Sequence, residues 1–278
     1  MKVKLTVLCE NSVVTPFGVI GEHGFSAYIE TENGNFLFDT GQGKGLINNA
    51  NVLGIDLKKI DFLCISHGHY DHTLGIPSLL TIKSPLKIYA HENIFANRYW
   101  LRPNMPPKFI GIPFRKEFLE TLGAKFEFIK DFTEVKKGIY ISGEVPRDPD
   151  YEMIDPDMKI INENGEKIQD TIIDDFSMAI DTDKGLVIIL GCAHAGIVNI
   201  LNYFIEKTGK EKIYAVVGGT HLGFANEKQL NKTLEIIEKY NIQKLGASHC
   251  TGLAVSSILA NMLKDKFFFA GVGAVLEV

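Results

Sequence analysis

Ser66-His67-Gly68-His69-Tyr70-Asp71-His72 places four metal-binding side chains within six consecutive residues. The apolar run before it, residues 60–65, is typical of a buried strand, and the apolar segment after it is typical of a helix. Because alternate residues of an extended chain point to the same side, His67 and His69 can face one position, while Asp71 and His72 begin the helix. Three neutral imidazoles and a carboxylate suit a borderline divalent cation such as zinc, iron(II) or manganese. The stretch therefore predicts a metal site at a strand end.

Length and composition describe a chain that can bury a full core. It has 278 residues, 45% of them hydrophobic, so we expect a single domain over residues 1–278. A net charge of −5 and a pI near 5.9 mean that the chain lacks the overall positive charge that attracts nucleic acid or an anionic membrane. No apolar run approaches the ~20 residues of a membrane span, and the first eight residues alternate like a strand rather than a signal peptide. Four cysteines without disulfide-scaffold spacing predict a reduced, cytoplasmic protein.

The pattern of the chain changes from strands to alternating strands and helices. Near the start, residues 2–9 alternate as a strand, and two strand-like runs flank Asn33-Gly34, a two-residue hairpin signal. A short helix at residues 46–53 and a buried strand at 85–90 follow. The last hundred residues predict strands at 185–190, 213–217 and 244–248, helices at 197–204, 227–240 and 253–263, and a strand-like end within 267–278. This order favours packed sheets with helices outside.

Two regions interrupt this pattern, at about residues 93–131 and 146–175. The first contains a helical segment near residues 114–122, and the second an Asn164-Gly165 hairpin. Long loops in a compact domain are often functional, so these regions are either insertions that form a substrate-binding rim or ordinary surface excursions. Tyr99, Trp100 and Phe109 in the first region can stack on a flat ring or pack on one another.

Three later segments also place a histidine directly after an apolar strand. They are Gly191-Cys192-Ala193-His194-Ala195-Gly196, Gly218-Gly219-Thr220-His221-Leu222 and Ser248-His249-Cys250-Thr251-Gly252. Sites assemble at the carboxyl ends of parallel strands, and glycines there let backbone and ligand approach closely. These histidines are therefore predicted to complete the metal site. His23 and His91 are weaker candidates, and His91 is predicted to start a helix or lie on a rim.

The histidine motif resembles that of a known family. His67-Gly68-His69-Tyr70-Asp71-His72, with Asp39 in Phe38-Asp39-Thr40-Gly41 upstream, is similar to the metallo-β-lactamase superfamily over nearly the whole chain. The late histidine segments, with Glu10-Asn11 and Glu22-His23-Gly24, resemble its 7,8-dihydropterin-6-methyl-4-(β-D-ribofuranosyl)aminobenzene-5′-phosphate synthase-like group. The resemblance implies an α/β fold, an αββα sandwich of two mixed sheets flanked by helices. It also implies one or two divalent metal ions at the sheet edges, zinc before iron or manganese.

The same resemblance implies a role for each residue of the site. The first metal would be held by His67, His69 and His194, and the second by Asp71, His72 and His249. Asp39 would orient a ligand histidine or brace the glycine-rich turn. His221 would protonate a leaving group or act as an additional ligand.

The chain departs from the superfamily pattern where a bridging aspartate is expected, because the late apolar strand ends in Gly191-Cys192. A Cys192 thiolate could take the bridging position, since a nearby metal lowers the pKa of a thiol. The alternative is a small buried residue that packs under the site. Asp174 or Asp175 could substitute as a ligand, or both could be surface acids that flank a hairpin.

The predicted function is a metal-dependent, hydrolase-like enzyme that acts on a phosphorylated or pterin-type small molecule. The metal would activate water or polarise the leaving group. Asp71 would orient the nucleophile, and Arg147 or Arg102 would bind an anionic part of the substrate. The resemblance extends this to a condensation of a dihydropterin with an aminobenzene riboside phosphate, which is a synthase rather than a hydrolase reaction.

Two other classes of function stay open. One is a metal-bearing sensor or binding protein with little turnover, which the altered bridging position favours. The other is a phosphodiesterase or RNA-processing nuclease, against which the acidic charge balance counts. A diiron redox role is disfavoured, because the chain lacks an appended flavin domain and carries His69 where an iron-favouring motif has glutamate. We expect a small-molecule partner, no membrane and no nucleic acid, and the oligomeric state is left open.

Overall fold

The computed structural model describes residues 1–152 and 154–278 of the chain. Over these residues the strands form two seven-stranded sheets and one four-stranded sheet. In spatial order, the first large sheet contains β18 (Val275–Glu277), β1 (Val3–Cys9), β2 (Ser26–Thr31), β3 (Gly34–Phe38), β4 (Phe62–Cys64), β5 (Leu86–Ala90) and β8 (Ala124–Phe128). The second contains β17 (Phe267–Phe269), β16 (Lys244–Ser248), β15 (Ile213–Gly219), β14 (Gly185–Leu190), β13 (Ser177–Thr182), β10 (Ile139–Ile141) and β9 (Thr133–Lys136).

The two large sheets are built alike. In the first, β18, β1, β2 and β3 pair antiparallel, and β3, β4, β5 and β8 run parallel. In the second, β9, β10, β13 and β14 pair antiparallel, and β14, β15, β16 and β17 run parallel. Each sheet therefore has a set of parallel strands whose carboxyl ends open on one edge, where functional groups collect.

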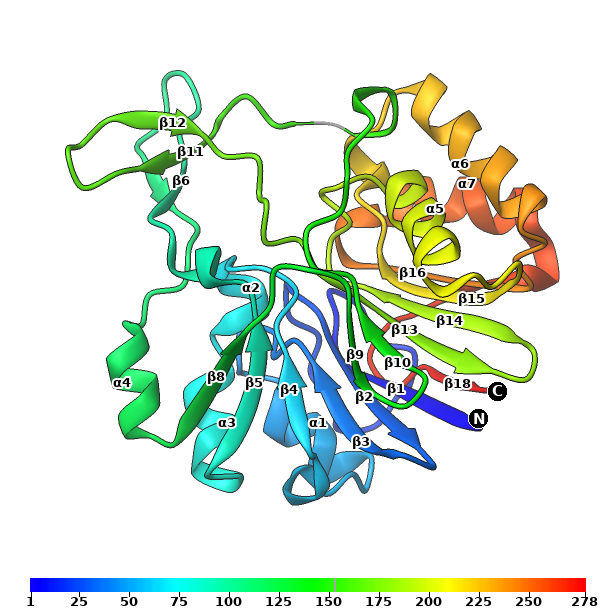
Figure 1. Cartoon of the computed structure of the whole chain (residues 1–278), viewed down its shortest axis with the longest axis horizontal. Coiled ribbons are helices and arrows are strands. Elements are labelled where there is room, and N and C mark those ends of the chain that lie inside the picture. Colours follow the sequence, from blue (N-terminus) through cyan, green and yellow to red (C-terminus); the bar gives the residue numbers. More distant parts are fainter. Residues whose placement is uncertain (153) are drawn as a thin grey trace.

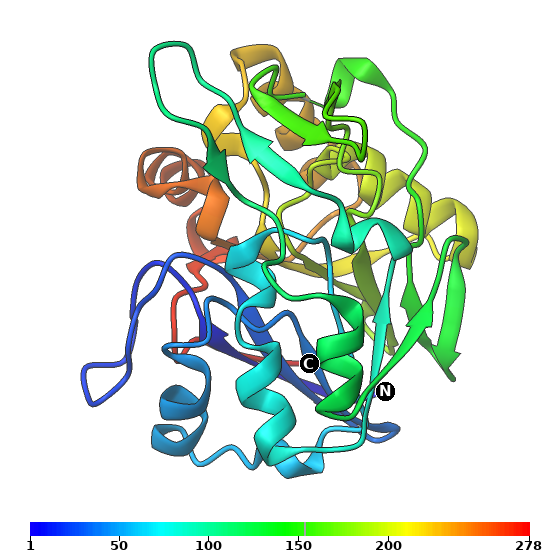
Figure 2. The same cartoon turned by 90° about the vertical axis from the view of Figure 1, so that its left-hand side faces the viewer.

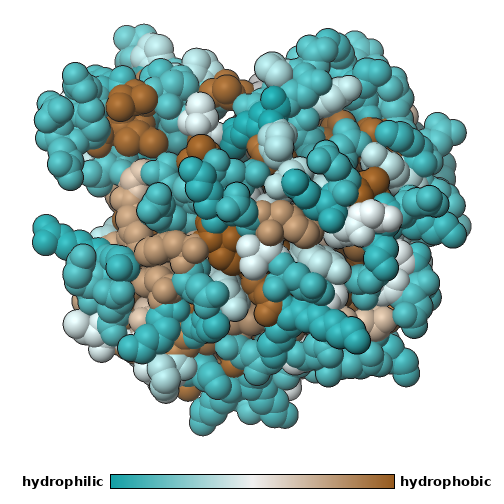
Figure 3. Space-filling model, viewed as in Figure 1, coloured by the Kyte–Doolittle hydropathy of each residue, from teal (hydrophilic) through white to brown (hydrophobic). Residues whose placement is uncertain are grey.

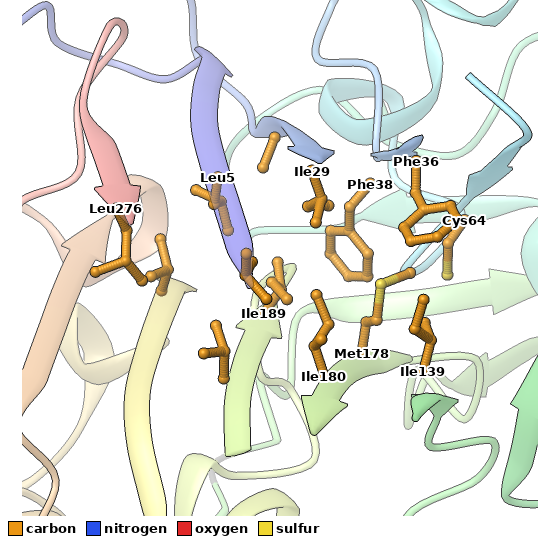
Figure 4. Packing of buried hydrophobic residues seen from close by; sticks show 14 of the residues in the cluster. Leu5, Ile29, Phe36, Phe38, Cys64, Ile139, Met178, Ile180, Ile189 and Leu276 are labelled. Atoms are coloured by element: carbon orange, nitrogen blue, oxygen red, sulfur yellow. The ribbon is translucent and has the colours of Figure 1, made fainter. Parts of the chain in front are cut away.

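The two sheets pack face to face over a hydrophobic core. In Figure 4, Phe36 and Phe38 of the first sheet lie opposite Met178 and Ile180 of the second. Phe36 also stacks on Phe62, with ring centroids 4.4 Å apart. Burial of such apolar side chains is the main favourable term in folding, so this layer holds the two sheets together.

Helices cover the outer face of each sheet, as both views in Figures 1 and 2 show. The first sheet is covered by α1 (Leu46–Val52), α3 (Ile76–Ile82) and α4 (Lys116–Thr121), and the second by α5 (Ile197–Thr208), α6 (Glu227–Lys239) and α7 (Leu253–Leu263). β14 is continuously apolar because Val187 faces the inter-sheet core while Ile188 faces the helices. The expected αββα sandwich is confirmed.

The four-stranded sheet joins the two regions that interrupt the sequence pattern. Its strands are β12 (Lys167–Gln169), β11 (Met158–Ile161), β6 (Arg98–Trp100) and β7 (Lys108–Phe109). The central pair, β6 and β11, is antiparallel and links one region to the other. Figure 1 shows this rim sheet at the upper left, and Figure 3 shows a hydrophobic group of side chains over it on a mostly hydrophilic face.

Several sequence predictions need correction in detail. The hairpin at Asn33-Gly34 is present, but its two-residue turn is Glu32-Asn33, because Thr31 pairs with Gly34. The region at 93–131 is less irregular than predicted, since it contains β6, β7 and β8, and β8 extends the first large sheet beside β5. Strands of two to five residues that pair far along the chain carry too little periodicity to be recognised. No helix among the described residues has the length and apolar character needed to cross a membrane.

Candidate metal centre

Strand β4 delivers the first histidines of the site. After Cys64 the chain leaves the first sheet, passes through His67 and His69, and enters the short helix α2 (Tyr70–Thr73), which lies near the centre of Figure 1. Gly68 is required between the two histidines, because a Cβ atom there would collide with the carbonyl oxygen of Ile94 and with Arg98. The tight approach of this loop to its neighbours therefore depends on glycine.

The second sheet delivers three more histidines from adjacent parallel strands. His194 follows β14, His221 follows β15, and His249 follows β16 at the start of a 3₁₀ turn (His249–Thr251). Because the strands run parallel, their carboxyl ends bring these residues to one edge of the sheet. That edge faces the β4 loop, where the rings of His67 and His194 have centroids 4.8 Å apart.

The first group of possible ligands consists of His67, Cys192 and His194. One donor atom from each of these buried residues lies within 4.8 Å of the other two. His69 adjoins the group, with its Nδ1 atom 2.9 Å from Nε2 of His67. The Nε2 atoms of His69 and His194 are buried without a hydrogen-bond partner. Buried polar atoms are normally paired, so the Nε2 atom of His194, a member of the first group, fits a bound cation, whereas His69 belongs to no ligand group among the described residues.

A second group consists of His72, Cys192 and His249, again within 4.8 Å of one another. The Nε2 atom of His72 is 3.3 Å from Nε2 of His249 and 3.3 Å from Sγ of Cys192. Oδ2 of Asp71 lies 3.4 Å from Nε2 of His249. Imidazole, carboxylate and thiolate donors that converge in this way match the ligand set of zinc and related divalent cations.

Asp39 fixes the orientation of two of these histidines. Its carboxylate accepts hydrogen bonds from Nδ1 of His72, from Oγ of Ser66 and from the Ser66 backbone N–H, each at 2.7 Å. Since the Ser66 hydroxyl donates to Asp39, it accepts from Nδ1 of His67, which lies 2.9 Å away. Both histidines therefore keep a proton on Nδ1 and turn the Nε2 atom toward the ligand groups.

Replacing Asp39 with asparagine should weaken zinc binding by about 10–100-fold, the usual effect of losing a residue that orients a metal ligand. Asparagine tolerates the positive φ of 57° at this position, so the backbone is expected to keep its conformation. Its amide offers one acceptor oxygen where the carboxylate offers two, so the hydrogen bond to His72 or to Ser66 is lost. A competition titration with a zinc indicator measures the effect, and Asp56→Asn, at an exposed turn, is the control. Equal zinc affinity in the Asp39 variant and the wild type would contradict the assigned role.

Burial keeps most of these imidazoles neutral at pH 7. Burial lowers the pKa of His67 and His194 well below the usual value, and burial followed by Arg98 lowers the pKa of His69 to about 3. Burial likewise lowers the pKa of His249. A neutral imidazole has a free lone pair, so these residues are available as ligands without first losing a proton.

His72 and Cys192 differ, because each holds a proton that a cation has to displace. Burial acts to lower the pKa of His72, but Asp39 and Asp71 outweigh it and raise this pKa to about 9. Burial raises the pKa of the Cys192 thiol well above its usual value. Metal binding at these two residues therefore releases protons.

The segment from Asp170 to Phe176 braces both ligand-bearing loops. Asp174 accepts a hydrogen bond from the Gly68 N–H at 2.8 Å, and Asp175 accepts one from the Ala195 N–H at 2.9 Å. The fully buried guanidinium of Arg98 pairs with both Asp170 and Asp174. The two carboxylates considered as substitute ligands, Asp174 and Asp175, belong to no ligand group among the described residues. They hold the loops that carry His67, His69 and His194.

His221 lies beside the ligand groups without belonging to one within the described part of the chain. Its ring centroid is 4.5 Å from that of His194, and it lines a small cavity together with Arg147 and Met158. The surrounding protein and the nearby His249 lower its pKa to about 4, so the imidazole is neutral at pH 7. A proton-donor role therefore requires an anionic ligand in the cavity, which would raise this pKa.

The two arginines predicted to bind substrate lie in different places. Arg147 lines the cavity beside His221, but its guanidinium already donates to the backbone carbonyls of Thr171 and Ile172. Arg102 follows β6 of the rim sheet, and its guanidinium lies 3.9 Å from the ring centroid of Trp100. Among the described residues it neither lines the cavity nor lies next to a ligand group. Tyr99 and Phe109 pack edge to face, with centroids 5.3 Å apart. His91 caps the 3₁₀ turn Glu92–Phe95, as its predicted helix-start position implies.

Other residues at the site have weaker signals in the sequence. Nε2 of the half-exposed His23 is 3.1 Å from Oδ2 of Asp71, and His23 forms a third donor group with Asp71 and His249. Glu10 accepts a hydrogen bond from the His249 N–H, and Asn11 lies 3.0 Å from Nδ1 of the same residue. In the sequence, the short polar motifs Glu10-Asn11 and Glu22-His23-Gly24 are the signal that points to these residues. By contrast, nothing local in the sequence marks Arg98 as buried.

An αββα sandwich with histidine, aspartate and cysteine side chains gathered between the strand ends of its two sheets is the arrangement of one large superfamily. The chain belongs to the metallo-beta-lactamase superfamily, whose family model matches residues 19–158.

Individual relatives agree with this membership. The chain is 32% identical to the 7,8-dihydropterin-6-methyl-4-(beta-D-ribofuranosyl)-aminobenzene-5'-phosphate synthase of Methanocaldococcus jannaschii. The 267 aligned residues cover 92% of this chain and 90% of that protein. A crystal structure of a metal-dependent hydrolase of the beta-lactamase superfamily matches with a TM-score of 0.84 at 27% identity, over 99% of each chain. The ribonuclease Z of Pyrococcus abyssi is 36% identical over 74 residues, which is 24% of each protein.

Proposed function

We propose that this protein is a metal-dependent enzyme that acts on a phosphorylated or pterin-type small molecule. The observation that carries the proposal is the convergence of two ligand groups, with a buried imidazole nitrogen of His194 that has no hydrogen-bond partner among the described residues. The relative from Methanocaldococcus jannaschii supports the substrate class, because its name describes a dihydropterin joined to an aminobenzene riboside phosphate.

His67, His69 and His194 would hold a first divalent cation, and Asp71, His72 and His249 a second, with zinc favoured by the nitrogen-rich ligand set. A cation bound there lowers the pKa of water and polarises a phosphate oxygen. Three histidines keep the Asp71 carboxyl ionised: burial acts to raise its pKa, but His72, His23 and His249 hold it well below the usual range. Asp71 can therefore orient a nucleophile as a carboxylate.

His221 and the cavity beside it provide the remaining chemistry. The neutral His221 imidazole accepts a proton when an anionic group enters the cavity, and then donates it to the leaving oxygen. In the condensation, the bond between the pterin methylene carbon and a diphosphate oxygen breaks and diphosphate leaves. The methylene carbon bonds to the amine nitrogen of the aminobenzene riboside, and the amine proton is released to solvent. Arg147, at the cavity wall, positions the anionic part of the substrate.

An assay with defined substrates tests the proposal. The purified protein should contain zinc or a related metal by elemental analysis, lose turnover after chelation and regain it with zinc. Hydroxymethyl-dihydropterin diphosphate should be consumed only in the presence of the aminobenzene riboside phosphate if the reaction is a condensation, and in its absence if the reaction is hydrolysis. The same assay should include phosphomonoesters, phosphodiesters and a short RNA, which complete the panel of candidate substrates.

The panel also separates the competing functions. Cleavage of RNA alone would favour a nuclease, and tight metal binding without turnover of any compound would favour a sensor. Either result would overturn the proposed small-molecule enzyme, as would full turnover by metal-free protein.

A further inference from the structure

Cys192 is the residue that joins the first ligand group to the second among the groups that the described residues form. Its sulfur lies within 4.8 Å of donor nitrogens of His67 and His194, and within the same distance of those of His72 and His249. The residue follows β14 directly and is 4% exposed. A side chain that only packed beneath the site would direct its sulfur toward apolar atoms, whereas this sulfur is 3.3 Å from Nε2 of His72.

Two imidazole nitrogens converge beside this sulfur. Nδ1 of His72 contacts Asp39, so its Nε2 atom is the one that faces the sulfur. Nδ1 of His249 faces Oδ1 of Asn11 at 3.0 Å, so its Nε2 atom is likewise turned into the site. The two Nε2 atoms lie 3.3 Å apart, next to the sulfur. A cation bound there would have both nitrogens and the sulfur as ligands.

No carboxylate takes the place of the sulfur among the described residues. Asp174 and Asp175 direct oxygens to backbone N–H groups of the neighbouring loops. Asp71 groups with His23 and His249 and shares no ligand group with His67 or His194 among the described residues. The sulfur is therefore the atom placed to contact both cation positions.

We propose that the Cys192 thiolate is a ligand shared by two cations, one held with His67 and His194 and the other with His72 and His249. This inference rests on the metal dependence in the proposed function and adds the ligand that joins the two positions. The thiol loses its proton to solvent as the first cation binds. A thiolate ligand favours zinc, cobalt(II), iron(II) and cadmium over magnesium and manganese, which prefer oxygen ligands.

Titration of the full-length, metal-free protein with cobalt(II) tests the shared ligand. Wild-type protein should bind two equivalents and develop near-ultraviolet thiolate-to-cobalt charge-transfer absorption that continues to grow through the second equivalent. Cys192→Ser should abolish the absorption and weaken binding of the second cobalt(II) ion. The loss of affinity should exceed about 10–100-fold, the usual effect of losing a residue that only hydrogen-bonds to a metal ligand. Cys192→Asp, which restores a bridging carboxylate, should bind both equivalents without the absorption.

Cys64→Ser and Cys250→Ser are matched controls, because Cys64 lies in the inter-sheet core and Cys250 donates to the carbonyl of Cys192. Both should retain the absorption. Absorption that saturates at one equivalent, or that persists in Cys192→Ser, would overturn the shared thiolate while leaving a metal-dependent enzyme intact. Absorption with two bound cations but no turnover would support the thiolate and overturn the proposed function. Failure of the wild type to bind cobalt would overturn both.

Discussion

Alanine in place of His67 should lower kcat/KM by about 10³-fold or more, because the loss of a ligand removes several kcal/mol of metal-derived stabilisation of the transition state. His67 belongs to the first ligand group with Cys192 and His194, and its Nε2 atom lies 2.9 Å from Nδ1 of His69. The metal content of the purified variant should fall by one equivalent, since alanine leaves that group with two of its three donors. Elemental analysis and the substrate assay measure the two effects on the same preparation.

His91→Ala is the matched control for this experiment. His91 is also buried, but it pairs with Glu144 at 3.0 Å and caps the turn that follows β5. It belongs to no ligand group among the described residues, so its loss should leave metal content and turnover near the wild-type values. Retained metal and unchanged turnover in His67→Ala would reject the assignment of His67 as a ligand.

Methionine in place of Arg98 should lower the free energy of unfolding by about 3–5 kcal/mol, the usual cost of removing one partner of a buried ion pair. Arg98 is fully buried, its Nε atom is 2.8 Å from Oδ2 of Asp170, and its terminal nitrogen contacts Asp174. Methionine fills a similar volume but leaves both carboxylates buried without a cation. Asp174 also accepts a hydrogen bond from the Gly68 N–H. The substitution should therefore also loosen the loop that carries His67 and His69.

Urea unfolding of the wild type and the variant measures this effect. Arg102→Met is the control, since Arg102 is half exposed and its contact with Asp157 is 3.8 Å long, so its loss should cost at most about 1 kcal/mol. Adding Asp170→Asn to Arg98→Met should recover part of the lost stability, because it removes one of the unpaired charges. A loss from Arg98→Met no larger than that of the control would contradict the proposed role of the buried pair.

The sequence predicts those parts of the fold and site whose signals are local. The apolar runs at β4 and β14 and the alternation over residues 2–9 identify strands, because burial on two faces or one produces those patterns. The positions of the candidate ligands follow from the same logic, since each histidine stands directly after a recognisable strand and the strand order brings His194 and His249 to one edge; their roles as ligands stay a prediction. Cys192 could be noticed for the same reason, as the residue at a strand end where an aspartate is expected.

The parts that the sequence could not predict depend on pairing between distant segments. β6 has three residues and β11 four, too few for a periodic pattern, and they meet only because the folded chain brings residues 98–100 and 158–161 together. The burial of Arg98 follows from that pairing, since an arginine in an apparently irregular stretch is ordinarily read as exposed. The one-residue shift of the hairpin turn to Glu32-Asn33 has a similar origin, because cross-strand register rather than turn propensity decides it.

The distance along the chain between the ligands gives a bound cation a mechanical role. His72 and His249 are 177 residues apart in sequence, yet their Nε2 atoms lie 3.3 Å from one another. A cation that binds both acts as a reversible crosslink between the first sheet and the last strands of the second. In an unfolded chain, closing a loop of that length costs on the order of 4–5 kcal/mol of entropy. Such a crosslink would make the two sheets resist unfolding together, so a bound metal would stabilise the sandwich in addition to any chemical role.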